Sequence, residues 1–311
     1  MNYSLIKNIE IDIPFKSSEF IYTDLQEIRI CRFCMKDEKK TKFENNSHSI
    51  PEFMGNKSLL LFTECDSCNN FFNKNYESHL AFYLGFERSA LGISGKNGVP
   101  EFKHVSDKLF IRNEKNEIVI GIDPESDYVK IDPIRKIVSF SLPKNPFVPY
   151  SVYKSFVKIA FSFLPFDKCA NLKSTQVFLK SKLKTIEGRE VNSTLLKYTI
   201  KNHFKKMFIR IYENQIKEKT NRPKYIAILG YNDKVFQFHI PNKELDDIDQ
   251  PFIMNCIQIF DEAYDIEEIN FNSTNLKRDE VENFTFKYED LDSSKMETDF
   301  FKSLLKKKNV D

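Results

Sequence analysis

The sequence predicts an α+β protein in which a small N-terminal module precedes a larger, mixed C-terminal domain. Three observations support this prediction: two closely spaced cysteine pairs, alternating strand-like runs between residues 108 and 142, and an apolar segment at residues 148–164. Alternation of apolar and polar residues is typical of half-buried strands, whereas an apolar run of this length fits a core helix. Helices and strands are therefore expected in separate parts of the chain.

The composition indicates a globular protein. The chain has 311 residues, 41% of them hydrophobic and 30% charged, which excludes a disordered or collagen-like chain. No run reaches the roughly 18–20 apolar residues of a membrane helix, because Lys154, Lys158 and Pro165 interrupt the longest candidate. The first residues lack the basic and apolar regions of a secretory signal, so a cytoplasmic protein without membrane contact is expected.

The cysteines predict a structural zinc site. Four of the six form two pairs with two-residue gaps, namely Cys31, Cys34, Cys65 and Cys68. Two such pairs can close a tetrahedral Zn²⁺ site, which then has no open position for chemistry. The alternative is four unrelated reduced thiols. Cys169 and Cys256 have no partner at ligand spacing and are predicted to lie in the core.

Two segments beside the second cysteine pair carry polar residues of interest. Residues 47–56, SHSIPEFMGN, contain a His, an Ile-Pro step and a Gly that permits a turn with positive φ. Residues 69–80, NNFFNKNYESHL, predict a helix with one apolar face. Asn69 and Asn73 are four residues apart and therefore lie on the same side of that helix.

The order of these elements resembles the HNH (His-Asn-His) endonucleases. The shared pattern is CxxC, a His followed by a hydrophobic-Pro step and a Gly turn, then CxxCN leading into a helix, over about residues 29–85. The likeness is to the branch whose ββα-metal, treble-clef-like site is braced by a four-cysteine zinc. It implies metal-dependent hydrolysis of phosphodiester bonds in nucleic acid, with DNA expected ahead of RNA.

The resemblance also implies roles for single residues. By position, His48 is the general base, Asn56 the middle Asn that orients the loop, Asn69 a metal ligand and Asn73 a further ligand. A neutral imidazole can accept a proton near pH 7 because its unperturbed pKa is about 6.5. A catalytic Mg²⁺ or Mn²⁺ would take oxygen ligands, which the Asn amides can supply.

The sequence departs from the family pattern just before the base. Ser47 stands where many members have an acidic or His metal ligand, so Glu77 or Glu52 is a candidate substitute. For several residues a structural interpretation competes: Asn69 as a helix cap, Asn73 as a solvent-facing residue. Glu77 and His79 are expected at the surface on the charged side of the helix.

Composition shifts divide the chain into four parts. We expect a strand-like extension at residues 1–28, the nuclease-like module at 29–95, a β-rich connecting unit at 96–145 and an α+β domain of unknown role at 146–311. The expected elements of that last domain are a helix at 148–164, a second helix from Pro165 to about 183, a hairpin at 225–241, strands at 251–260 and 266–272, and a Lys-rich helix at 299–308.

The net charge of +2 hides a strong asymmetry. Residues 180–224 contain 13 Lys or Arg and four acidic residues. Residues 244–311 contain eight Lys or Arg and 18 acidic residues. The basic segment, with Tyr198, Phe204, Phe208 and Tyr212, suits phosphate contact and base stacking. It is equally well interpreted as a solvated amphipathic helix. The acidic part could restrain the basic face or bind a partner.

Together these features predict a metal-dependent DNA endonuclease, with a role in defence against foreign DNA suggested by analogy alone. The alternative is a catalytically silent zinc module that binds nucleic acid or a protein, an alternative that Ser47 favours. A third hypothesis makes the C-terminal domain a sensor for a small ligand or regulatory protein. In that case, deleting residues beyond about 145 should raise cleavage.

Overall fold

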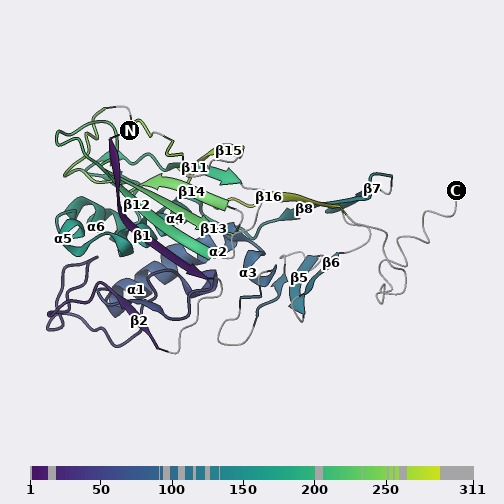
Figure 1. Cartoon of the computed structure of the whole chain (residues 1–311), viewed down its shortest axis with the longest axis horizontal. Helices are drawn as coiled ribbons and strands as arrows, with labels where there is room; N and C mark the ends of the chain where they lie inside the picture. Colours follow the sequence, from purple (N-terminus) through teal and green to yellow (C-terminus); the bar gives the residue numbers. More distant parts are fainter. Residues whose placement is uncertain are drawn as a thin grey trace.

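The computed structural model describes most of the chain. The described residues are 2–12, 19–90, 92–93, 99–103, 109–114, 117–122, 127–132, 134–199, 206–232, 234–250, 252–254, 256–258 and 265–287. His104, His203, Phe204 and the Lys-rich helix expected at 299–308 lie outside them. Helices and strands occur in separate parts of the chain, which confirms the α+β prediction (Figure 1).

A six-stranded antiparallel sheet forms the centre of the protein. Its strand order is β1 (Tyr3–Asp12), β12 (Lys206–Asn214), β13 (Tyr225–Tyr231), β14 (Lys234–His239), β11 (Thr194–Thr199) and β15 (Asp265–Asn270). Every residue of β13 and β14 is buried, and these two strands form the predicted hairpin. The N-terminal strand β1 pairs with β12 along its whole length, so the expected extension belongs to this sheet.

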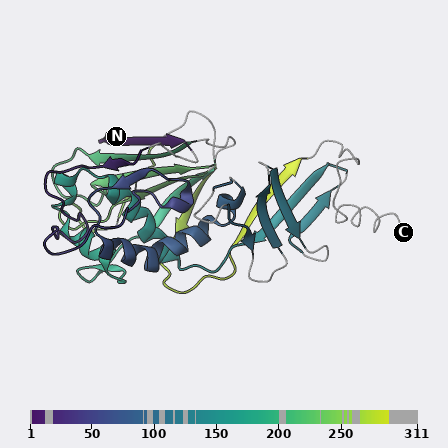
Figure 2. The same ribbon diagram turned by 90° about the horizontal axis from the view of Figure 1, so that it is seen from below.

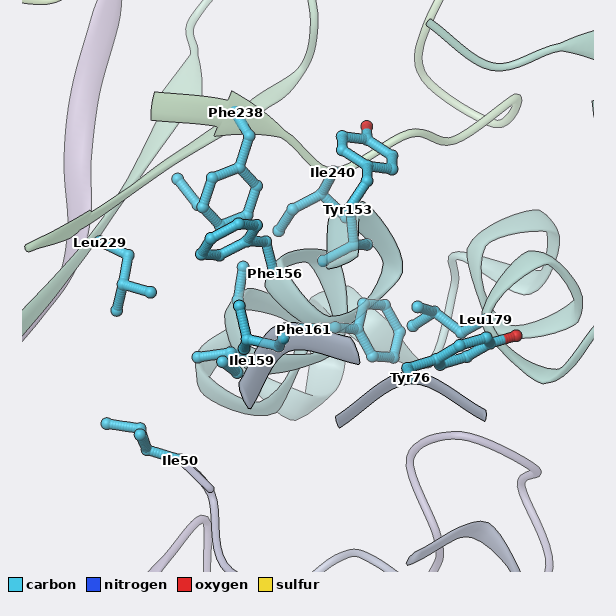
Figure 3. Packing of buried hydrophobic residues seen from close by; sticks show 14 of the residues in the cluster. Ile50, Tyr76, Tyr153, Phe156, Ile159, Phe161, Leu179, Leu229, Phe238 and Ile240 are labelled. Carbon is cyan, nitrogen blue, oxygen red and sulfur yellow. The ribbon is translucent and has the colours of Figure 1, made fainter. Parts of the chain in front are cut away.

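Helix α4 (Pro149–Phe163) packs between the sheet and the N-terminal half of the chain. Phe156 contacts Phe236 and Phe238 of β14, with ring centroids 4.8 and 5.4 Å apart. Figure 3 shows Phe238 and Ile240 on one side of this helix, and Tyr76 and Ile50 on the other. One hydrophobic cluster includes all of these residues, so the two halves of the protein share a core. The segment after Pro165 forms two short helices, α5 (Phe166–Cys169) and α6 (Lys173–Lys180).

The N-terminal half contains short strands and one long, irregular helix. Strand β2 (Ile21–Thr23) runs parallel to β3 (Leu59–Leu61), with the turn η1 (Glu52–Met54) between them in the chain. Helix α1 (Asp66–Phe72) continues through the π-helical turn η2 (Asn73–Glu77) into α2 (Ser78–Leu84). This confirms the predicted helix after the second cysteine pair. The short α3 (Glu87–Ala90) follows.

Two small sheets lie to one side of the central sheet (Figures 1 and 2). One contains β4 (Phe102–Lys103), β5 (Leu109–Glu114) and β6 (Glu117–Ile122); the other contains β7 (Val129–Asp132), β8 (Ile137–Pro143) and β16 (Val281–Lys287). The strand-like alternation at residues 108–142 thus gives two antiparallel hairpins. Because β16 pairs with β8, the C-terminal part of the chain completes the second of these sheets.

Several predictions for the C-terminal half are wrong. The described part of the basic segment 180–224 forms strands, including β9 (Thr185–Ile186) and β10 (Arg189–Glu190), rather than an amphipathic helix. Tyr198 is fully buried and cannot stack on a base. The described residues of the expected strand 251–260 are not in a strand, and Cys256 is exposed, whereas Cys169 is buried as predicted. In the described part of the chain, no helix is long and apolar enough to cross a membrane.

Candidate active site and metal centre

The four paired cysteines come together at the start of α1. Their sulfur atoms lie within 4.8 Å of one another, and the sulfurs of Cys34 and Cys65 are 3.7 Å apart. A tetrahedral ion with Zn–S bonds of about 2.3 Å separates its ligands by about 3.8 Å, so these residues fit Zn²⁺. Cys31 and Cys34 come from a tight turn, while Cys65 caps α1 and Cys68 lies in its first turn. A zinc ion here would join the turn to the helix.

His48 lies on an extended segment beside β3. It forms an isolated antiparallel bridge with Leu60, flanked by hydrogen bonds from Ser49 N to Leu59 O and from Leu61 N to Ser47 O. The ring is half-buried, and among the described residues its buried Nδ1 has no hydrogen-bond partner. Burial lowers the pKa of His48, and the nearby Lys158 and Lys57 act in the same direction against Glu52 and Glu77. The imidazole is therefore neutral at pH 7, the form that a general base requires.

Asn56 closes the loop that follows His48. Its Nδ2 donates to Ile50 O and Leu59 O, and its Oδ1 accepts from Leu59 N, all at 2.8 Å. The side chain is fully buried, so each of these bonds is made away from water. Gly55, with φ of 99°, provides the turn with positive φ that the sequence predicts. Asn56 thereby holds both ends of the loop at the extended segment of His48.

The remaining candidate ligands of a catalytic metal ion are less favourably placed to bind it. Ser47 is buried, and its hydroxyl has no hydrogen-bond partner among the described residues. Asn69 is half-buried and lies inside α1. The helix-cap interpretation is wrong, because the N-cap residue of α1 is Cys65. Asn73 is exposed, as its solvent-facing interpretation predicted. Apart from the cysteines, no group of three or more His, Cys, Asp and Glu in the described ranges is close enough to share an ion.

Comparison with known protein families identifies the segment that contains these residues. Residues 31–84 match the family model described as HNH endonuclease. The resemblance deduced from the sequence is thus confirmed, and we call residues 31–84 the HNH module. Neither the curated proteins nor the solved structures give a match to the chain.

A buried arginine ties the Cys31–Cys34 turn of the HNH module to α4. Arg32, between the first two cysteines, donates from Nη1 to Phe161 O and Leu164 O, at 2.6 and 3.0 Å. Its Nε donates to Thr63 Oγ1, and its Nη2 pairs with Asp24. These carbonyls lie at the C-terminal end of α4, where the helix dipole favours a cation. The cysteine turn is therefore anchored on the C-terminal half of the chain.

A buried lysine of α4 reaches the segment that carries His48. Lys158 Nζ lies 3.2 Å from Glu64 Oε2, 3.2 Å from Glu77 Oε1 and 3.4 Å from His48 O. Lys158 and Glu64 are fully buried, and burial raises the pKa of Glu64 to about 7. Burial acts to lower the pKa of Lys158, but the two carboxylates outweigh it and the net shift is upward. A cation between two acids thus fixes the main chain at His48.

The expectation that Glu77 and His79 lie at the surface is wrong. Glu77 is half-buried against Lys158, and His79 Nδ1 accepts a hydrogen bond from Val148 N. Sequence reasoning also missed Arg32, Glu64 and Lys158. A signal for Lys158 was present, since a lysine inside an apolar helix needs a partner when it is buried. Nothing in the sequence indicated that the partners would be 81 and 94 positions away.

Proposed function

We propose that this chain is a metal-dependent endonuclease that hydrolyses phosphodiester bonds in DNA, with His48 as its general base. The observation that supports the proposal is a neutral imidazole on the extended segment beside β3, followed by the loop that Asn56 closes. In this arrangement His48 accepts the proton of the attacking water, and Asn56 keeps the loop in register with β3.

A catalytic Mg²⁺ or Mn²⁺ would stabilise the charge that develops on the phosphate and the leaving oxygen. Asn69 is the amide ligand that the family pattern assigns, with Asn73 as a further donor. The carboxylates suggested as substitutes are engaged elsewhere: Glu52 pairs with Lys57 at 2.8 Å, and Glu77 pairs with Lys158. This donor set suits a hard ion that keeps several waters, which is the usual habit of Mg²⁺.

The test is cleavage of plasmid DNA by the full chain with Mg²⁺ or Mn²⁺. The wild-type protein should nick or linearise the plasmid, and His48→Ala should lose at least about 100-fold in rate, the usual contribution of a general base. Asn69→Ala should also reduce the rate, whereas Asn70→Ala, at an exposed position on the same helix, is the matched control. Equal rates for wild type and His48→Ala would refute the assignment of the base. RNA of the same sequence tests the choice of substrate.

A second candidate function is a silent zinc module that binds nucleic acid or a protein. Ser47 favours it, because a buried neutral hydroxyl replaces the usual ligand and no acidic cluster among the described residues compensates. Absence of cleavage with any divalent ion, together with retained binding of DNA, would select this alternative. The proposed role in defence rests on analogy with other nuclease modules joined to unrelated domains. Its test is protection of a bacterial host against phage by wild type but not by His48→Ala.

A further inference from the structure

A cavity lies between the helix of the HNH module and the start of α4. Its volume is about 390 Å³, within the range of small-molecule sites. It is lined by residues of η2 and α2 on one side, by α4 on another, and by Lys182 and Thr274. His48, Asn56 and the cysteines do not line it, so the cavity is separate from the candidate active site.

The polar lining of this cavity is cationic or neutral. Among the described residues it contains Lys74, Lys154, Lys182 and His79, together with neutral polar groups, and no Asp or Glu. None of the three lysines forms an ion pair with a carboxylate of the described residues. For Lys74 and Lys182, which are exposed, this is ordinary; for Lys154 it is not, because the other buried cations of the described residues pair with carboxylates.

Lys154 is the buried member of this group. It is 1% exposed, and its Nζ donates to Phe178 O and Ser181 O at 2.7 and 2.5 Å while lying 4.2 Å from the centre of the Phe178 ring. Two of its three N–H donors are thus used within the described residues. Burial lowers the pKa of Lys154 to about 7, and a bound anion would supply the missing opposite charge.

His79 adds a neutral donor to the lining. Because Nδ1 accepts from the backbone N–H of Val148, the ring proton resides on Nε2. Burial also lowers the pKa of His79, which keeps this tautomer neutral. The cavity therefore combines positive charge with N–H donors, which is the combination that recognises an oxyanion.

We propose that this cavity binds a phosphate oxyanion, carried either by a small phosphorylated molecule or by a nucleic-acid backbone. The cavity lies next to the ion pair of Lys158. The turn η2 supplies Tyr76 to the cavity and Glu77 to that ion pair. On α4, Lys154 lies one turn before Lys158. The inference concerns binding alone, so it stands or falls independently of the proposed nuclease activity.

The experiment is isothermal titration calorimetry of the full, zinc-loaded chain with adenosine monophosphate and with inorganic phosphate, at constant ionic strength. At least one of these probes, or a short single-stranded oligonucleotide, should bind saturably. The double variant Lys74→Ala/Lys182→Ala should weaken that binding by about tenfold or more, since hydrogen bonds to charged groups are the strong ones. Both lysines are exposed, so this variant should fold; Lys173→Ala, exposed on α6 and outside the lining, should bind normally.

Each result decides the question. If the mononucleotide binds and the oligonucleotide does not compete, the phosphate belongs to a small molecule; binding of the oligonucleotide alone, lost in the double variant, assigns it to a nucleic-acid backbone. Lys154→Met, checked for folding by its melting transition, should also abolish binding. No saturable binding of any probe, or binding that the double variant and folded Lys154→Met leave unchanged, would overturn the proposal.

Discussion

Two different supports hold the HNH module, and they differ in how far they reach along the chain. The cysteine cage joins residues 31–34 to residues 65–68, all inside the segment that matches the family model. The second support comes from α4, whose Lys158 and C-terminal carbonyls bind the loop of His48 and the cysteine turn from outside that segment. The cysteine cluster thus organises the module from within, whereas the position of His48 depends on the C-terminal half of the chain.

This dependence bears on the sensor hypothesis. Deleting residues beyond about 145 would remove Lys158 and the carbonyls that Arg32 binds, and would expose the shared core. Glu64 would then be left without its cation. Loss of activity on truncation is therefore the expected result, whether or not the C-terminal domain senses a ligand, so the deletion no longer tests that hypothesis.

The largest effect is expected from breaking the first support. Cys65→Ser should remove the zinc and unfold the module, because structural zinc contributes on the order of 10 kcal/mol or more to the folding of small domains. The zinc content, measured by metal analysis, should fall from about one Zn²⁺ per chain to none, and the circular dichroism spectrum should show a lower helix content. Cys256→Ser, at an exposed cysteine, is the control and should change neither. Full zinc content in Cys65→Ser would rule out the four-thiolate site.

The next largest loss of stability should come from removing Lys158, the cation of the second support. Lys158→Met leaves Glu64 buried without a cation, and removal of one partner of a buried pair costs roughly 3–5 kcal/mol. We expect a lower midpoint of denaturant unfolding and slower cleavage, with the zinc content unchanged. Adding Glu64→Gln should restore part of the stability, because the uncompensated charge is then gone.

The zinc content of Lys158→Met also shows whether the two supports are independent. If Lys158→Met loses its zinc together with its stability, the two supports form one cooperative unit and are not separable. Lys180→Met, at an exposed position on α6, should stay within about 0.5 kcal/mol of wild type.

The two supports also differ in how well the sequence predicts them. The cysteine spacing predicted the cage because its ligands come in two local pairs, and local patterns also predicted the turn at Gly55 and the helix after Cys68. The second support pairs Lys158 with residues 81 and 94 positions away, a distance at which local patterns carry no information. The pairing of β1 with β12 was hidden for the same reason.

Apolar composition alone misled the prediction at Cys256. The run FIMNCIQIF suggested a buried strand, yet its described residues are not in a strand: Cys256 is exposed, and Ile257 N donates to the side chain of Gln237 in β14. The opposite error occurred at Glu77, where a charged residue on a helix suggested solvent and the structure supplies a buried cation instead. In both cases the tertiary neighbours decided the outcome, and these are set by long-range topology.

A smaller effect is expected from opening the loop of His48. Asn56→Ala removes three buried hydrogen bonds and leaves Ile50 O, Leu59 O and Leu59 N without them. The expected cost is about 1–3 kcal/mol, with a further loss of cleavage rate because the segment of the base is less well fixed. Calorimetric melting and plasmid cleavage measure the two effects. A variant as stable as wild type but inactive would indicate that Asn56 contacts the reacting groups directly.

The smallest effect concerns the protonation of the base. Because the pKa of His48 is lowered from 6.5, mainly by burial, the cleavage rate should stay constant from pH 8 to below 6.5 and then fall about tenfold per pH unit as the ring is protonated. Lys57→Met removes a cation that lowers this pKa and releases Glu52, which raises it. The midpoint of the pH–rate profile should therefore move upward in Lys57→Met. A midpoint that moves downward would show that another group titrates in this range, and the base would have to be sought elsewhere in the module.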